Sequence, residues 1–333
     1  MNVFLLAVSF AVILAGALLF TNAVEWLGHR LNLGEGAVGS LLAAVGTAMP
    51  ETLIAIVALV GSAEGGEDVA IGAIVGAPFL LATLAMGLVG LFAYLYRDRR
   101  TQGLTLDAHA PTLERDILFF LAFFALSLAL SWGAPAAVRI PIGVIVFLAY
   151  AVYIRKTLLG SGEVQSHGSL DPLIFERREE HQANPSIVFC VIQLLVGLGA
   201  MVGGAHLFVE ELLHIAESLG IQAVVLSLVL APLATELPEK VNSFFWVREG
   251  KDSLALGNIT GAMVFQSTIP FGIGLLFTDW SLTGDAQLSV ALGLIGGFLA
   301  YEALHRRDRF SLPVVVAWFT LYASYIVIVA VTA

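Results

Sequence analysis

The stretches GTAMPETLIAIVA (46–58) and LATELPEKVNSFFW (233–246) each place a glutamate directly after a proline inside an otherwise apolar run. These glutamates are Glu51 and Glu239. Ionisable side chains are rare inside membrane-spanning helices, and those that occur usually lie on an ion or substrate path. The two stretches therefore predict a membrane protein with a functional site inside the bilayer.

The composition supports this prediction for the whole chain. The hydrophobic residues make up 58% of the sequence and the mean hydropathy is +0.90, whereas about half of the residues of a soluble domain are apolar. Charged residues make up only 13%, and the net charge of −10 comes largely from loops. We therefore expect the lipid bilayer and inorganic cations as partners, and no nucleic acid.

Apolar runs long enough to cross a hydrocarbon core of about 30 Å recur along the chain. They lie near 2–28, 36–61, 69–96, 115–132, 136–156, 186–213, 221–247, 253–278, 286–304 and 311–331. The first run has no basic segment before it, so we interpret it as a spanning helix and not as a signal peptide. The sequence predicts an all-α integral membrane protein with ten transmembrane helices. A polar linker at 160–185 separates five helices in 1–159 from five in 186–333.

The basic residues predict the orientation. Successive predicted loops lie on alternate sides of the membrane. Of the 16 Lys and Arg, 14 fall in loops on one side, whereas Arg139 lies on the other side and Lys240 lies within a helix. Lys and Arg accumulate in cytoplasmic loops. We therefore expect a protein of the plasma (inner) membrane with the linker in the cytoplasm and both termini outside.

The two halves contain related motifs. The segment 44–81 matches the segment 231–268, so that Thr47-x-x-Pro-Glu51 parallels Thr235-x-x-Pro-Glu239. Because five is an odd number, the second copy enters the bilayer from the opposite side. This predicts two inverted-topology repeats, with broken helices 2, 3, 7 and 8 meeting at a binding site near the midplane.

The prolines in these motifs expose backbone oxygen atoms. Proline has no amide hydrogen, so Pro50 and Pro238 leave the carbonyl groups of Gly46 and Ala234 without their helical donors. Carbonyl oxygens beside carboxylates are the ligands that Ca²⁺ prefers. The motifs therefore predict a hard-oxygen cation site.

Glycines follow each motif at a four-residue spacing. They are Gly72 and Gly76 in the first half and Gly257 and Gly261 in the second. This spacing permits close packing between membrane helices. We expect both pairs to act as packing positions beside the site.

The motifs GTAMPE and ATELPE, followed by GAIVGAPFLL and GNITGAMVFQ, resemble the two alpha-repeats of the calcium/cation antiporter superfamily. This superfamily includes the sodium/calcium exchangers and the calcium/proton exchangers. The resemblance implies that Glu51 and Glu239 bind the transported Ca²⁺ as its metal ligands. It also implies that Thr47 and Thr235 contribute to the same site.

The sequence departs from the sodium/calcium exchangers at several positions. Those proteins usually read G-T-S-x-P-E, and here the serine position is Ala48 in one half and Glu236 in the other. Their next helix usually reads G-S-N-x-x-N or G-S-N-x-x-D, and here the last position is Leu81 or Gln266. Oxygen atoms for Na⁺ are therefore missing, and Gln266 is closer to the proton-coupled branch.

One face of helix 7 is unusually polar. At 100° per residue, Glu236, Glu239, Lys240 and Ser243 share this face. Lys240 either acts as a built-in coupling cation, with Ser243 beside it, or only neutralises Glu236. Both interpretations are open at this point.

Weaker candidates lie nearby. His206 and Glu210 are one turn apart on helix 6 and form either a proton relay or a buried pair. Residues that could line the same cavity are Asn258, Thr260, Ser267 and Thr268. We expect Cys190 to be a packing residue.

The sequence thus predicts a secondary active antiporter that exchanges Ca²⁺ for H⁺ or Na⁺ by alternating access, without a cofactor. A passive cation channel and a transporter of another divalent cation are the alternatives. An enzyme is not expected, because an intramembrane metalloprotease needs a motif such as H-E-x-x-H, which the sequence lacks. The oligomeric state is left open.

Overall fold

The computed structural model describes residues 2–30, 43–61, 64–101, 103–105, 110–160, 172–176, 185–307 and 309–332. Within these ranges, the side chains at 2, 28, 43–47, 110, 158–160, 237–242, 307 and 332 lie outside the description. In the described part of the chain every regular element is a helix, and the extended pairing is confined to isolated bridges.

The helices follow one another from end to end of the chain. Their order is α1 (Asn2–Arg30), α3 (Ala43–Val60), α4 (Gly66–Leu80), the π-helix η2 (Leu81–Ala85), α5 (Met86–Leu95), α6 (Ala110–Ala129), α7 (Ala136–Gly160), α8 (Ile187–Leu219), α9 (Ala223–Arg248), α10 (Asp252–Gln266), α11 (Ile269–Phe277), α12 (Gly284–Arg307) and α13 (Leu312–Thr332).

Seven helical segments in the described ranges are long and apolar enough to cross a membrane. They are Val3–Leu27, Gly66–Leu95, Ala136–Thr157, Ile187–Leu219, Asp252–Phe277, Gly284–Arg306 and Leu312–Val331. Shorter apolar segments lie in α3 and α9, and α6 covers most of the predicted run 115–132. The protein is therefore an all-α integral membrane protein, and the count of ten spans stays a prediction.

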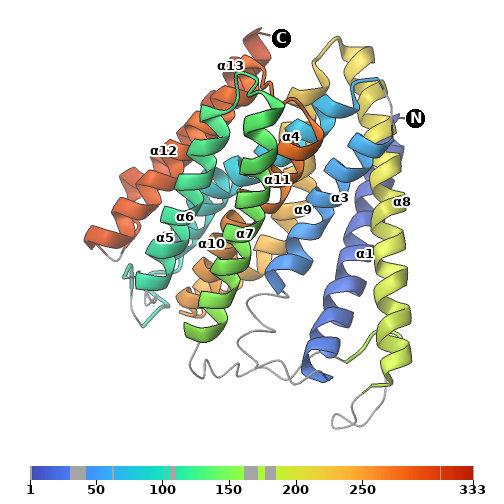
Figure 1. The fold of residues 1–333 in the computed structure, drawn as a ribbon. Helices are drawn as coiled ribbons and strands as arrows, with labels where there is room; N and C mark the ends of the chain where they lie inside the picture. Colours follow the sequence, from blue (N-terminus) through green and yellow to red (C-terminus); the bar gives the residue numbers. More distant parts are fainter. Residues whose placement is uncertain are drawn as a thin grey trace.

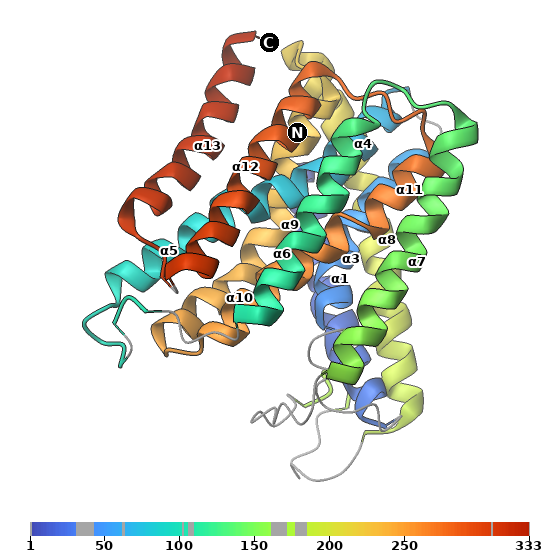
Figure 2. The same cartoon turned by 60° about the vertical axis from the view of Figure 1, so that its left-hand side comes forward.

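The helices form one bundle with distinct flanks (Figures 1 and 2). Helices α1 and α8 pack along each other on one flank, and α12 and α13 lie on the opposite flank. Between the flanks, α3, α4, α9 and α10 pack against one another. The two ends of the chain lie at the same end of the bundle, as an even number of spans requires (Figure 1).

The crossing of α4 and α9 depends on two glycines. A Cβ atom on Gly72 would lie 2.5 Å from the carbonyl oxygen of Val224, and one on Gly76 would lie 2.4 Å from that of Leu228. The predicted close packing at these glycines is confirmed. At Gly257 the prediction is wrong, because a Cβ atom there would meet nothing within 4 Å.

The predicted breaks in helices 2, 3, 7 and 8 need correction. Helices α3 and α9 run without interruption past Pro50 and Pro238, because a proline removes one backbone hydrogen bond and neighbouring groups can support the rest of the helix. Beyond Pro78 the helix continues through η2 into α5. A true interruption separates α10 from α11, at Ser267 and Thr268.

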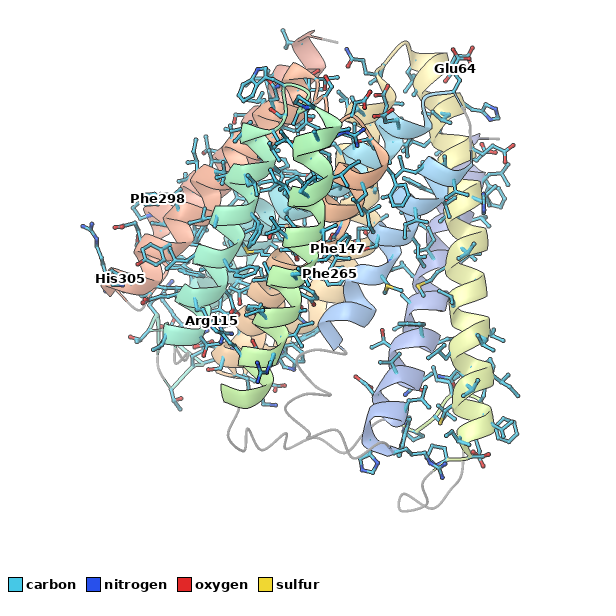
Figure 3. All side chains as sticks on the ribbon, in the orientation of Figure 1. Glu64, Arg115, Phe147, Phe265, Phe298 and His305 are labelled. Carbon is cyan, nitrogen blue, oxygen red and sulfur yellow. The ribbon has the colours of Figure 1, made fainter. Side chains whose placement is uncertain are left out.

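Charged side chains gather toward the two ends of the bundle. Figure 3 shows Glu64 at the end that holds the termini, whereas Arg115 and His305 lie toward the other end. One basic residue of the predicted loops is buried instead. The fully buried guanidinium of Arg100 lies 2.6 Å from the buried carboxylate of Asp252 and donates to the carbonyl oxygen of Val247 at 3.0 Å.

Candidate functional site

The two sequence motifs meet in the interior of the bundle. Glu51 on α3 is 1% exposed and Thr235 on α9 is fully buried. The hydroxyl group of Thr235 is hydrogen-bonded to Oε1 of Glu51, and it also lies 2.8 Å from the carbonyl oxygen of Ala231. An acid from the first half of the chain and a hydroxyl from the second therefore form one buried polar contact.

A second contact joins α9 to α10. The amide Nε2 of Gln266 donates to Oε1 of Glu236 at 3.2 Å, and both side chains are fully buried. Glu236 directly follows Thr235, so the two contacts are adjacent along α9. Glu51, Thr235, Glu236 and Gln266 are thus four predicted site residues that the fold buries in the bundle through two adjacent contacts.

Two further buried polar atoms belong to predicted site residues. The hydroxyl Oγ of Ser243 and Oε1 of Gln266 have no hydrogen-bond partner within the described part of the chain. Buried polar atoms are usually satisfied, so both are places where a bound water or ion would be favoured.

Four predictions fall partly or wholly outside this description. The side chains of Thr47, Glu239 and Lys240 lie outside the described residues. The backbone of Gly46 and Ala234 is helical, and coordination of a cation by their carbonyl groups stays a prediction.

The electrostatics of the site favour a positive partner. A carboxylate taken out of water needs a counter-charge, a proton or a metal ion to offset the loss of hydration. Among the described side chains, no three His, Cys, Asp or Glu residues come close enough to hold a metal ion. The predicted ligand set includes Glu239, whose side chain lies outside the described residues. The other predicted ligands of the cation are carboxylate, amide and hydroxyl oxygens.

The corresponding positions of the first motif are apolar. Ala48, which matches Glu236, is fully buried and packs against Tyr150, Val264 and Phe265. Leu81, which matches Gln266, is fully buried in η2 and belongs to the main apolar core. The additional polar groups of the site therefore come from the second half of the chain.

A comparison with protein families identifies the chain. The model described as sodium/calcium exchanger protein matches residues 1–157 and 189–331, which together make up most of the sequence. The chain belongs to the sodium/calcium exchanger family. The protein is therefore a member of a family of membrane transporters and not of catalytic enzymes, and the resemblance seen in its motifs is confirmed.

Known proteins resemble this exchanger along most of its length. It is 25% identical to the putative antiporter CaxA of Alkalimonas amylolytica over 298 residues, and this alignment covers 87% of each chain. Its fold matches the crystal structure of the H⁺/Ca²⁺ exchanger CAX with a TM-score of 0.73 at 18% identity, over 99% of this chain and 86% of CAX. It matches the sodium-calcium exchanger NCX_Mj with a TM-score of 0.61 at 22% identity, over 98% of each chain. At these identities the two structures support the fold alone.

The weaker candidates of the exchanger have other roles. His206 and Glu210 are exposed on α8, so the expectation of a buried pair is wrong. Helix α8 has 33 residues and is about 50 Å long at 1.5 Å per residue, so it extends well beyond the hydrocarbon core. Cys190 is fully buried, as expected of a packing residue.

The polar residues of α10 divide between different surroundings. Thr260 donates to Oδ2 of Asp116 on α6 at 3.3 Å, and Thr268 donates to the carbonyl oxygen of Val264 at 2.7 Å. Ser267 lines a small cavity beside Gln266. Asp116 was not among the residues predicted from the sequence, although its neighbours Glu114 and Arg115 mark the start of helix 4 as unusually charged.

Proposed function

We propose that this exchanger is a secondary active cation antiporter that exchanges Ca²⁺ for H⁺ or Na⁺ by alternating access. The contact of Glu51 with Thr235 carries the proposal, since it brings an acid and a hydroxyl of the two motifs together in the buried centre of the bundle. In this proposal Glu51 and Glu239 are the metal ligands. Thr47, Thr235, Glu236 and Gln266 complete the cation-binding site.

The proposed topology consists of two inverted five-helix repeats, 1–159 and 186–333, joined by the linker 160–185. The position of both chain ends at one end of the bundle supports an even number of spans (Figure 1). With the basic loops in the cytoplasm, both termini lie outside and the linker lies inside, in a plasma (inner) membrane.

Protons are the counter-ion that the described geometry favours. The hydroxyl of Thr235 has one hydrogen, yet its oxygen is close to two acceptors, Oε1 of Glu51 and the carbonyl oxygen of Ala231. A proton on Glu51 would satisfy both contacts, because Glu51 could then donate to Thr235 while Thr235 donates to Ala231. The apolar residues Ala48 and Leu81 also remove oxygen atoms that would bind Na⁺.

Ser243 and Lys240 are the proposed coupling residues. Ser243 lies two turns from Glu236 on α9, and its buried hydroxyl has no partner among the described residues. An ammonium group on this face of the helix would neutralise one carboxylate when Ca²⁺ is absent. Lys240 would then exchange places with the transported cation.

The test is transport by the purified exchanger in proteoliposomes. Uptake of ⁴⁵Ca²⁺ is measured with a proton gradient alone, with a Na⁺ gradient alone, and with neither. We expect uphill uptake with the proton gradient. The Glu51→Gln and Glu239→Gln variants should lose this uptake while remaining folded in the membrane, because each amide keeps the shape of the side chain and loses its charge.

Each other outcome selects an alternative. Uptake that follows the Ca²⁺ gradient and ignores both driving ions would indicate a passive cation channel. Uptake driven by Na⁺ at constant pH would assign the protein to sodium coupling. Uptake of Mn²⁺ in preference to Ca²⁺ would indicate a transporter of another divalent cation.

A further inference from the structure

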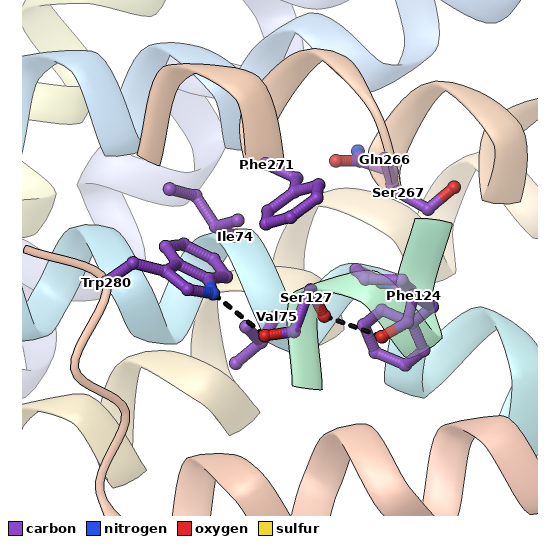
Figure 4. A pocket seen from close by; sticks show the side chains of 9 residues that line it. Ile74, Val75, Phe124, Ser127, Gln266, Ser267, Phe271 and Trp280 are labelled. Carbon is purple, nitrogen blue, oxygen red and sulfur yellow. Dashed lines mark hydrogen bonds between the residues drawn. The ribbon is translucent and has the colours of Figure 1, made fainter. Parts of the chain in front are cut away.

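A small cavity lined by buried side chains lies beside the candidate cation site (Figure 4). It is bounded by α4, by α6, by the interruption between α10 and α11, and by Trp280 in the connection between α11 and α12. Its volume is about 10 Å³, which is close to the space that one water molecule needs. Gln266 and Ser267 form one part of its wall, so the cavity adjoins the residue that binds Glu236.

One polar atom on this wall lacks a partner. Gln266 donates its Nε2 to Glu236, which leaves Oε1 as the acceptor of the same amide group. This oxygen is buried and accepts no hydrogen bond from any described residue. An unsatisfied buried acceptor is unfavourable, and a water molecule in the adjoining cavity would remove that cost.

Trp280 forms the wall on the opposite side of the cavity. Its indole ring is fully buried. Its backbone φ is 50°, and no other non-glycine residue in the described chain has a positive φ. Such a conformation is unfavourable for a bulky side chain and persists only where the surroundings hold it. The indole Nε1 donates to the carbonyl oxygen of Ser127 at 2.9 Å, and the backbone N–H donates to Oγ1 of Thr278 at 3.0 Å.

The helix beneath the indole ring is shaped to receive it. A Cβ atom on Gly274 would lie 2.4 Å from Cζ3 of Trp280, so only glycine lets the ring lie there. The ring of Phe271 packs on the indole with 5.0 Å between centroids. The connection that carries Trp280 lies at the end of the bundle where the chain ends (Figure 2), and the backbone N–H of Leu282 donates to the carbonyl oxygen of Ser131 at 2.9 Å, in the turn that follows α6.

We propose that this cavity is a hydration subsite of the cation site, occupied by one water molecule bound to Gln266, and that the indole of Trp280 is its lid. When the indole swings away, water from that end of the bundle reaches Gln266 and, through it, Glu236. When the indole returns, the site is closed on this side. The role of this water in transport rests on the proposed function, whereas the subsite and its lid do not.

The lid is tested by cysteine accessibility. The only native cysteine, Cys190, is replaced by Ala, and Ser267→Cys places a thiol on the cavity wall. The purified protein in nanodiscs is treated with a membrane-impermeant methanethiosulfonate reagent. We expect slow labelling with Trp280 present and labelling at least tenfold faster in the Trp280→Ala variant. The Trp280→Phe variant keeps an aromatic ring in place and should stay close to the parent rate.

A control separates the lid from general loosening. Ser289→Cys on α12 is equally buried and is not part of the cavity wall, so its labelling rate should not respond to Trp280→Ala. If Trp280→Ala does not fold, Gly274→Ala displaces the ring from the other side and should also accelerate labelling of Ser267→Cys. Unchanged labelling in the folded lid variants, or equal acceleration at both cysteines, would overturn the proposal.

This result is independent of the transport assays. Labelling requires neither Ca²⁺ nor a gradient, so it stands even if Glu51→Gln retains full transport and the proposed function fails. Conversely, a closed cavity in every lid variant would leave the antiporter proposal intact.

Discussion

At the scale of single residues, Thr235 holds the most specific position in the candidate site. Its hydroxyl group belongs to the second motif and is hydrogen-bonded to Glu51 of the first motif. Its one hydroxyl hydrogen is shared between that carboxyl group and the carbonyl oxygen of Ala231, so its orientation should follow the charge of Glu51.

Thr235→Val should weaken the apparent Ca²⁺ affinity by about 10- to 100-fold, because a hydrogen bond to a charged group contributes about 1.5–3 kcal/mol. Thr235→Ser keeps the hydroxyl group and should stay within about threefold of the parent. The Ca²⁺ dependence of uptake in proteoliposomes measures both variants. Parental affinity in the valine variant would remove Thr235 from the site.

At the scale of elements, the packing of α4 against α9 distinguishes the two repeats. Gly72 brings α4 close to the backbone of α9 at Val224, whereas its counterpart on α10, Gly257, has open space at its Cβ position. The glycine spacing is the same in both motifs, but close helix packing is found at Gly72 and Gly76 and not at Gly257.

Gly72→Ala should therefore destabilise the protein by about 1–3 kcal/mol, the usual cost of forcing an extra group into a packed interface. Gly257→Ala is the matched control and should have little effect, since nothing lies within 4 Å of its Cβ position. Thermal unfolding of the purified variants in one detergent compares them. Equal stabilities would show that α4 and α9 can separate without cost.

At the scale of the whole molecule, a buried ion pair links the two halves of the chain. Arg100 belongs to the first half and Asp252 begins α10 in the second, 152 residues away. Arg100 also donates to Thr105 at 3.1 Å and to Val247, so it joins the turn after α5 to the α9–α10 connection.

Arg100→Met should cost about 3–5 kcal/mol, because it leaves the carboxylate of Asp252 buried without its cation. Adding Asp252→Leu to Arg100→Met should recover part of that loss, since removing both charges avoids an unpaired one. Thermal unfolding of the two single variants and the double variant tests this. Strictly additive losses would show that the two side chains stabilise the protein independently.

Much of the fold was predictable because hydrophobicity is local. Each predicted apolar run coincides with helix in the described residues, and the acids of both motifs stand out against them. The breaks were less predictable. Pro50 and Pro238 each leave the helix continuous, because the consequence of one missing hydrogen bond depends on the neighbouring helices.

The sequence by itself determined the membrane class, the repeated motifs and the positions of the acids Glu51 and Glu236, since these follow from composition and spacing along the chain. The family followed from the resemblance of the motifs to known proteins and from the match to the family model. Only the tertiary structure decided that Thr235 reaches Glu51 across 184 residues, that Arg100 is buried, and that Trp280 and Gln266 line one cavity. Such contacts depend on how helices pack in three dimensions, and residues distant in sequence carry no local signal of their partner.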